Sequence, residues 1–213
     1  MDLTGWLRVC PIVAILRGIE PKEVESICSA LESEGIAIVE VPLNSPNALE
    51  SIAILSRTFG DRMLIGAGTV TKAGQVADVA ARGGHLIVTP NAHTAIVRTS
   101  KETGLLVIPG CFTPTEAFEL LDAGADAIKL FPAEVLGTPM LKALRAVLPK
   151  SAGMIPVGGI NAENIPEWMA AGAVGVGVGT SIYRPGDDVA VVQHKARALV
   201  TAVAQHTQVG VKT

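Results

Sequence analysis

Two ionisable residues interrupt runs of apolar residues that have the character of buried strands. Lys129 lies within Ala-Ile-Lys-Leu-Phe at 127–131, and Glu40 lies within Ile-Val-Glu-Val-Pro at 38–42. A strand of a parallel sheet is buried on both faces, so a charge within it is costly unless it has a partner or a function. Because side chains alternate along a strand, Lys129 shares a face with Ala127 and Phe131, and Glu40 shares one with Ile38. We therefore predict that both side chains point into the interior, near the C-terminal ends of their strands.

A lysine and a carboxylate in such a place predict a particular chemistry. Aliphatic surroundings disfavour the charged form of a lysine, which leaves a neutral amine that can form a Schiff base with a ketone. A nearby carboxylate can then move the protons that imine formation and carbon-carbon cleavage require. The alternative is a structural ion pair between Lys129 and Glu40 that merely fills the interior.

Two glycine-rich segments follow the last two predicted strands. They are Val157-Gly158-Gly159-Ile160-Asn161 and Gly177-Val178-Gly179-Thr180-Ser181. Bare backbone amides next to a helix N-terminus bind phosphate, and barrels of parallel strands often hold a phosphate after strands seven and eight. Either segment alone is also explained by a tight turn that requires glycine. Two at adjacent strand ends favour a phosphorylated ligand.

Other predicted strand ends carry polar residues, and Arg17 is the candidate among them for a substrate carboxylate or phosphate. The remaining candidates there are Thr69, Thr89 with Pro90 and Asn91, and Cys111. No group of His, Asp and Glu has a spacing typical of metal ligands, so we predict no metal site and no cofactor.

The elements that must position these residues alternate along the chain. Eight short apolar runs predict strands at 9–16, 36–41, 63–67, 85–88, 105–108, 125–130, 154–157 and 174–178. Segments with helical spacing separate them, and several end at a glycine just before the next run, as at Gly35, Gly104, Gly124 and Gly172. Eight strand-helix units in about 200 residues predict an α/β fold, a single (β/α)8 TIM barrel. An open doubly wound sheet is the alternative.

The whole chain, 1–213, is predicted to form one domain. Residues 2–8 are predicted to form a short N-terminal helix over the bottom of the barrel, and residues 208–213 a frayed tail.

Composition excludes several classes of partner. The net charge of -3 gives no basic footprint for nucleic acid, and no apolar run reaches the ~18 residues that a membrane span needs. The first residues, which include Asp2, do not resemble a secretory signal. Cys10, Cys28 and Cys111 are odd in number and lack metal-ligand spacing, which favours a reduced, cytoplasmic protein.

At these same residues the sequence resembles the 2-keto-3-deoxy-6-phosphogluconate and 2-keto-3-deoxy-6-phosphogalactonate aldolases, and the match runs almost end to end. The segments that carry it are Ile-Leu-Arg-Gly at 15–18, Val-Glu-Val-Pro-Leu-Asn-Ser-Pro at 39–46, Gly-Ala-Gly-Thr-Val at 66–70, Ile-Val-Thr-Pro-Asn at 87–91, Pro-Gly-Cys at 109–111 and Lys-Leu-Phe-Pro-Ala-Glu at 129–134.

The resemblance implies a role for each candidate residue. Lys129 is the imine-forming residue and Glu40 the general acid/base. The predicted substrate contacts are Arg17, Thr69, Asn44, Pro90 and Val157, and the predicted phosphate contacts are Gly158, Gly159, Gly179 and Ser181. The gluconate branch has an arginine where this chain has Asn44 and a threonine where it has Val157, so both departures resemble the galactonate branch.

The function implied is a class I lyase that cleaves 2-dehydro-3-deoxy-6-phosphogalactonate to pyruvate and D-glyceraldehyde 3-phosphate. The partner implied is a small phosphorylated keto acid, and the family's usual state is a homotrimer without metal. Three alternatives stay open: the phosphogluconate-cleaving aldolase, a phosphosugar isomerase or epimerase that leaves Lys129 without a covalent task, and a non-catalytic barrel that binds a phosphosugar.

Overall fold

A computed structural model of the chain describes residues 2–209, in which helices and parallel strands alternate. The strands are β1 (Ile12–Ile15), β2 (Ile38–Pro42), β3 (Leu64–Gly68), β4 (Leu86–Val88), β5 (Leu106–Ile108), β6 (Gly110–Cys111), β7 (Ile128–Leu130), β8 (Met154–Pro156) and β9 (Val176–Val178). The helices are α1 (Leu3–Val9), α2 (Val24–Ser33), α3 (Ala48–Phe59), α4 (Gly74–Ala81), α5 (Thr94–Glu102), α6 (Pro114–Asp122), α7 (Ala133–Val147), α8 (Ile165–Ala170) and α9 (Val189–Val209).

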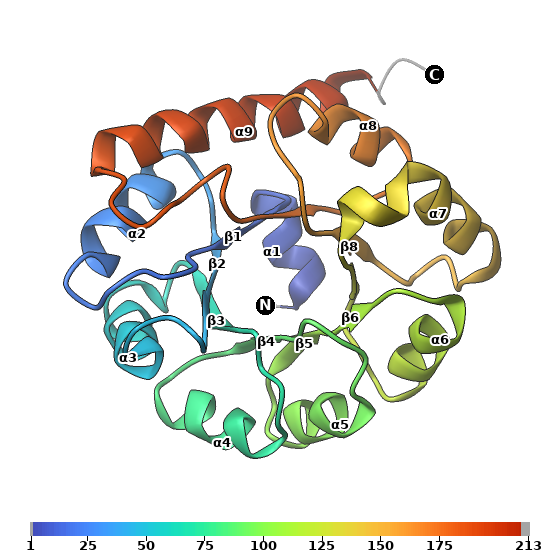
Figure 1. Ribbon diagram of the computed structural model, residues 1–213, viewed down its shortest axis with the longest axis horizontal. Helices are drawn as coiled ribbons and strands as arrows, with labels where there is room; N and C mark the ends of the chain where they lie inside the picture. Colours follow the sequence, from blue (N-terminus) through green and yellow to red (C-terminus); the bar gives the residue numbers. More distant parts are fainter. Residues whose placement is uncertain (1, 210–213) are drawn as a thin grey trace.

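The strands form two curled parallel sheets. Six strands pair in the order β5-β4-β3-β2-β1-β9, and three pair in the order β6-β7-β8. A parallel bridge between Val157 and Gly177 links β8 to β9, and Pro109 alone separates β5 from β6. Figure 1 shows the strands arranged around a common centre, with α2 to α9 on the outside. The fold is thus α/β with parallel strands inside a ring of helices, and the open-sheet alternative is disfavoured.

The predicted strands overlap the observed ones, most of which begin one to three residues later than predicted, and two of the differences have a local cause. The run at 9–16 is too long, because Val9 ends α1 and β1 begins only at Ile12. The run at 105–108 contains β5 but not β6, which follows Pro109 as a separate short strand. A proline has no N–H to donate, so the ladder is interrupted there.

Four predicted helix ends are confirmed by the backbone. The glycines at these ends all have positive φ, the conformation in which a helix ends without the steric cost of a Cβ atom. They are Gly35 (φ 88°), Gly104 (φ 78°), Gly124 (φ 101°) and Gly172 (φ 103°).

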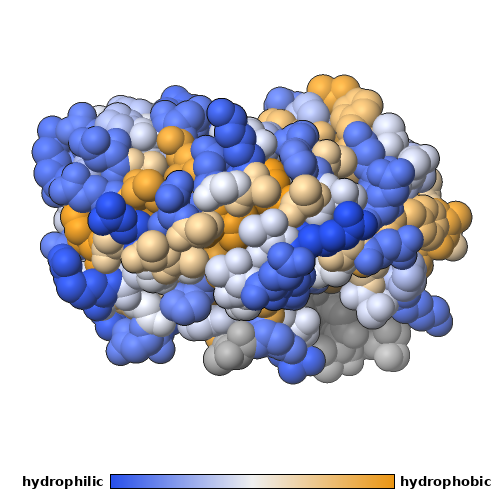
Figure 2. All heavy atoms as spheres, turned by 90° about the horizontal axis from the view of Figure 1, so that it is seen from below, coloured by the Kyte–Doolittle hydropathy of each residue, from blue (hydrophilic) through white to orange (hydrophobic). Residues whose placement is uncertain are grey.

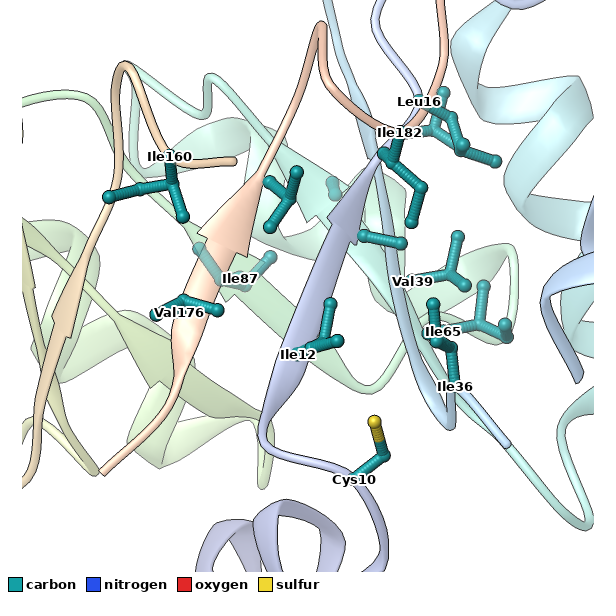
Figure 3. Close-up of a cluster of buried hydrophobic side chains, with 14 of the residues drawn as sticks. Cys10, Ile12, Leu16, Ile36, Val39, Ile65, Ile87, Ile160, Val176 and Ile182 are labelled. Atoms are coloured by element: carbon teal, nitrogen blue, oxygen red, sulfur yellow. The ribbon is translucent and has the colours of Figure 1, made fainter. Parts of the chain in front are cut away.

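The hydrophobic core has an outer and an inner layer. The outer layer, between strands and helices, contains Ile12, Val39 and Val176, which Figure 3 shows as part of one buried cluster. The inner layer lies among the strands and includes Ile15 and Ile38. The side chains of one strand therefore alternate between the layers, as a parallel sheet buried on both faces requires.

The N-terminal helix lies against one end of the inner core. Helix α1 is one residue later than predicted, because the Asp2 carboxylate caps it by accepting a hydrogen bond from the Gly5 amide at 2.7 Å. Leu3 and Leu7 pack into the inner layer, and Figure 1 shows α1 in the middle of the ring. The helix thus covers one end of the interior and leaves the other end for ligands.

The predicted tail begins too early. Helix α9 continues through Gln208 and Val209, and the rest of the predicted tail, 210–213, lies outside the described residues. No helix in residues 2–209 is long and apolar enough to cross a membrane.

Candidate active site

Lys129 and Glu40 are both buried in the inner layer, as their strand faces predicted. Lys129 is 5% exposed and Glu40 is 1% exposed. They border one small void, which is otherwise lined by Val13, Ile15, Val88, Ile108, Ile155, Val157 and Gly177. Lys129 lies one residue before the end of β7 and Glu40 two residues before the end of β2, so both are close to the C-terminal ends of their strands. The two strands thus present both side chains to the same interior space.

Glycine on the neighbouring strand makes room for the Glu40 carboxyl group. A Cβ atom at Gly68, the last residue of β3, would lie 1.8 Å from Glu40 Oε2. Within the described residues, Oε2 is buried and has no hydrogen-bond partner. An unpaired buried oxygen is costly, so this atom is available to a ligand that brings a proton or a donor.

Burial moves both groups toward their neutral forms. It lowers the pKa of Lys129 below its ordinary value, and the Glu40 carboxylate only partly opposes this effect. Burial also raises the pKa of Glu40 to about 7, against the opposing attraction of Lys129 and Arg17. Loss of its proton makes an amine a nucleophile, and a protonated carboxyl group is a proton donor, so both pKa shifts favour attack on a carbonyl.

Arg17, Asn44 and Thr69, three predicted substrate contacts, come together just after the ends of β1, β2 and β3. Arg17 donates hydrogen bonds to Asn44 Oδ1 at 2.8 Å and to Thr69 Oγ1 at 3.2 Å. Thr69 has a positive φ of 54°, which is unusual for a β-branched residue and costs of order 1–3 kcal/mol. The strained Thr69 thus accepts a hydrogen bond from Arg17 through its hydroxyl group. Thr69 and Asn44 together fix the position of the Arg17 guanidinium group.

A cavity of about 530 Å³ opens over Lys129. It is lined by Ile15, Arg17, Gly18, Lys129, Phe131, Val157, Gly158, Gly159, Ile160, Gly177, Gly179, Thr180, Tyr183, Arg184 and Pro185. Lys129 Nζ lies 4.6 Å from the centre of the Phe131 ring. A volume of this size accommodates a small organic ligand. A second hollow of about 420 Å³, which includes Ser45 and Gln75, contains neither Lys129 nor Glu40.

The structure brings most predicted site residues to this cavity but leaves some outside its lining. Lining it are Arg17, Lys129, Val157, Gly158, Gly159 and Gly179, whereas Glu40, Asn44, Thr69, Pro90 and Ser181 do not line it. Glu40 reaches it through the adjoining void, and Asn44 and Thr69 through Arg17. Pro90 is half-buried against Gly110, and Ser181 is half-buried one residue beyond the lining residue Thr180.

Tyr183 and Arg184 are among the lining residues that sequence reasoning missed. The available signal was their position, five residues or fewer after Gly179 in the second glycine-rich segment. Elsewhere in the described part of the chain, no group of three or more His, Cys, Asp or Glu is arranged to hold a metal ion.

The comparisons with known proteins agree with this geometry. The family model "KDPG and KHG aldolase" matches residues 3–195. The chain is 44% identical to the 2-dehydro-3-deoxy-6-phosphogalactonate aldolase of Escherichia coli K12, over 95% of this chain and 99% of that one.

Two solved structures extend the comparison. One, described as native KDPGal, superposes with a TM-score of 0.92 at 44% identity and covers 93% of this chain and 96% of its own. The other is a KDPG aldolase from Legionella pneumophila with pyruvate captured as a covalent carbinolamine intermediate. It has a TM-score of 0.85 at 29% identity and covers 94% and 98% of the two chains. The chain described here belongs to the KDPG and KHG aldolase family.

Proposed function

We propose that this chain is a class I aldolase that cleaves 2-dehydro-3-deoxy-6-phosphogalactonate to pyruvate and D-glyceraldehyde 3-phosphate. The observation that carries the proposal is a buried lysine with a lowered pKa at the base of a ligand-sized cavity, beside a buried carboxyl group. The Escherichia coli relative of the same name supports the choice of substrate.

The two buried groups have complementary tasks in this reaction. The neutral amine of Lys129 adds to C2 of the keto acid, and the carbinolamine loses its hydroxyl as water when Glu40 donates a proton. The resulting iminium is the electron sink. The Glu40 carboxylate left by that step accepts the C4 hydroxyl proton, the C3–C4 bond breaks, and its electron pair moves into an enamine as the aldehyde leaves. Protonation of the enamine at C3, followed by hydrolysis of the imine, releases pyruvate and regenerates the Lys129 amine.

The remaining site residues bind the two ends of the substrate. Arg17, steadied by Thr69 and Asn44, holds the carboxylate. The amides of Gly158, Gly159 and Gly179, with the Ser181 hydroxyl, hold the phosphate. Pro90 and Val157 shape the walls. The iminium replaces a metal as electron sink, so the reaction as proposed uses no cofactor.

The test is reductive trapping. Pyruvate and borohydride should give one irreversible adduct, located at Lys129 by peptide mass. Lys129→Met should abolish both the adduct and cleavage while the chain stays folded, because methionine fills a similar volume without a nucleophilic amine. Lys142→Met, at an exposed position of α7, is the matched control and should behave as wild type. An adduct at another lysine, or cleavage by Lys129→Met, contradicts the proposal.

The proposal includes a closed (β/α)8 barrel in a single domain, 1–213. Support comes from the bridge between β8 and β9 and from the Asp126 amide, which donates to Val107 O at 3.0 Å where the two sheets meet. Location in the cytoplasm is supported by three cysteines that are all buried and free of disulfides.

A homotrimer is the proposed assembly. Phe112 (45% exposed), Phe118 (42%) and Val135 (68%) expose apolar surface on neighbouring elements, the end of β6 and helices α6 and α7. Figure 2 shows apolar residues gathered at its right-hand margin, the side on which α6 and α7 lie in Figure 1. Exposed apolar surface of this kind favours contact with another subunit.

A further inference from the structure

Arg184 is a cation that lines the cavity and has no task in the mechanism above. It lies in the segment between β9 and α9, five residues after Gly179. Two lining side chains are arginines, Arg17 and Arg184, and none of the lining residues is acidic. The cavity therefore suits a ligand with more than one negative group.

Local contacts hold Arg184 in place near Asp187, whose pKa its charge helps to lower. Its Nε donates to the Thr180 carbonyl oxygen at 3.2 Å, and its backbone amide donates to Asp187 Oδ2 at 2.8 Å. Lys195 Nζ, at 2.5 Å, also donates to that carboxylate and, with other groups, lowers the pKa of Asp187. Among the described residues, no ion pair includes Arg184, so its two terminal nitrogens are free to bind a ligand.

The neighbouring residue, Pro185, anchors this segment to the segment that follows the adjacent strand β1. A Cβ atom at Gly18 would lie 2.7 Å from Pro185 Cγ, so the chain at Pro185 rests directly on the Gly18 backbone. Gly18 has a φ of 82° and its amide donates to Ser45 Oγ at 2.9 Å. This packing fixes the position of Arg184 relative to Arg17.

We propose that Arg184 is the charged ligand of the substrate phosphate, an inference that rests on the proposed function. The substrate has a carboxylate at one end and a phosphate at the other. Arg17, which hydrogen bonds to Asn44 and Thr69 hold in place, is already assigned to the carboxylate. The glycine amides give the phosphate hydrogen bonds but no net positive charge. Arg184 supplies that charge as a planar fork that matches two phosphate oxygens.

The test compares Arg184→Gln, Arg184→Lys and wild type on the keto acid with and without its phosphate. Arg184→Gln should raise KM for the phosphorylated substrate roughly 10- to 100-fold, as expected for loss of charge-assisted hydrogen bonds. It should change kcat/KM for the unphosphorylated acid less than about twofold, because no charged contact is lost. Arg184→Lys should lie between the two, since a lysine keeps the charge but not the fork. Arg98→Gln, an exposed arginine on α5 away from the cavity, should match wild type.

Two further measurements separate this inference from the proposed function. Inorganic phosphate should bind wild type by calorimetry and bind Arg184→Gln at least about tenfold more weakly. Pyruvate trapping at Lys129 should be equal in both. Equal losses on both substrates, or unchanged phosphate binding, overturn the role of Arg184. Failure of trapping in wild type overturns the lyase, while phosphate binding still decides the role of Arg184.

Discussion

At the scale of single residues, the site depends on two groups that share one buried void. Separately, a buried lysine and a buried glutamate each carry a desolvation cost. Their opposite charges attract each other, yet burial has the larger effect on the pKa of each group. Each pKa is therefore shifted in the direction that favours the neutral form. The direction of both pKa shifts favours a reactive pair over a structural ion pair, in which attraction would be the larger effect.

The raised pKa of Glu40 gives a prediction about stability and pH. The folded-state pKa of about 7 exceeds the ordinary value of 4.5, so the folded chain holds a proton that the unfolded chain has released. The stability that Glu40 contributes is therefore fully present below about pH 4.5 and lost as pH rises through about 7. Denaturant unfolding at fixed protein concentration should show that the free energy of unfolding of wild type falls relative to that of Glu40→Gln between pH 4.5 and about 7. Parallel curves for the two proteins contradict the assignment.

Val157 gives a prediction about substrate preference. Its side chain is 7% exposed and presents an apolar wall to the cavity. The two candidate substrates differ in configuration at C4, and a hydroxyl left unpaired in a closed site costs on the order of 1–3 kcal/mol. We expect wild type to have a higher kcat/KM for the phosphogalactonate than for the phosphogluconate. Val157→Thr should reduce the ratio of these two values roughly ten- to hundredfold. Steady-state assays of both epimers measure the ratio. A wild type that prefers the phosphogluconate contradicts the assignment to the galactonate branch. An unchanged ratio in Val157→Thr shows that Val157 does not set the preference.

Residue types were a good guide to chemistry but a poor guide to exact strand bounds and to loops. Lys129 and Glu40 were predictable because charges are rare within apolar strands. The first residues of their strands were not, because strand ends shift by a few residues with pairing that the sequence does not display. Arg184 was missed because an exposed loop arginine has the same local pattern whether it faces a cavity or solvent.

At the scale of elements, β3 matters to the site through a missing side chain. Gly68 leaves the space that the Glu40 carboxyl group occupies, and its requirement is steric, because it does not belong to the glycines with positive φ. This role was not predictable from sequence. The Gly-Ala-Gly segment at 66–68 indicates close packing. Which side chain occupies the space, here Glu40, depends on the pairing of β3 with β2, which the sequence does not display. The helix-ending glycines were predictable, because their conformation is a local property.

Gly68→Ala should impair catalysis by displacing Glu40. The added methyl group would overlap the carboxyl group, so turnover should fall at least about tenfold, in the direction of Glu40→Gln, for which loss of acid/base help typically gives 10²- to 10⁴-fold. Pyruvate should still be trapped at Lys129, but more slowly. Gly74→Ala, where a Cβ atom would meet nothing within 4 Å, is the matched control and should retain full turnover. Equal activity of Gly68→Ala and wild type shows that the carboxyl group can shift without consequence.

At the scale of the whole molecule, the cavity and the exposed apolar surface belong to different parts of the ring. The residues that line the cavity lie at the ends of β1, β7, β8 and β9 and in the segments after them. The exposed Phe118 lies on α6, outside the ring of strands. Assembly and chemistry should therefore be separable by mutation.

Phe118→Glu should dissociate the proposed trimer and leave the lyase site competent. A glutamate on α6 would place a charge in an apolar contact and could not be desolvated there without large cost. Sedimentation equilibrium should give three chain masses for wild type and one for the variant, while pyruvate and borohydride still label Lys129 in both. Val191→Glu changes a similarly exposed residue, 40%, on α9, which lies apart from α6 in Figure 1, and should remain trimeric. A wild type that sediments as a monomer refutes the assembly. A Phe118→Glu variant that stays trimeric places the contact on another surface, and loss of labelling on dissociation shows that a neighbouring subunit completes the site.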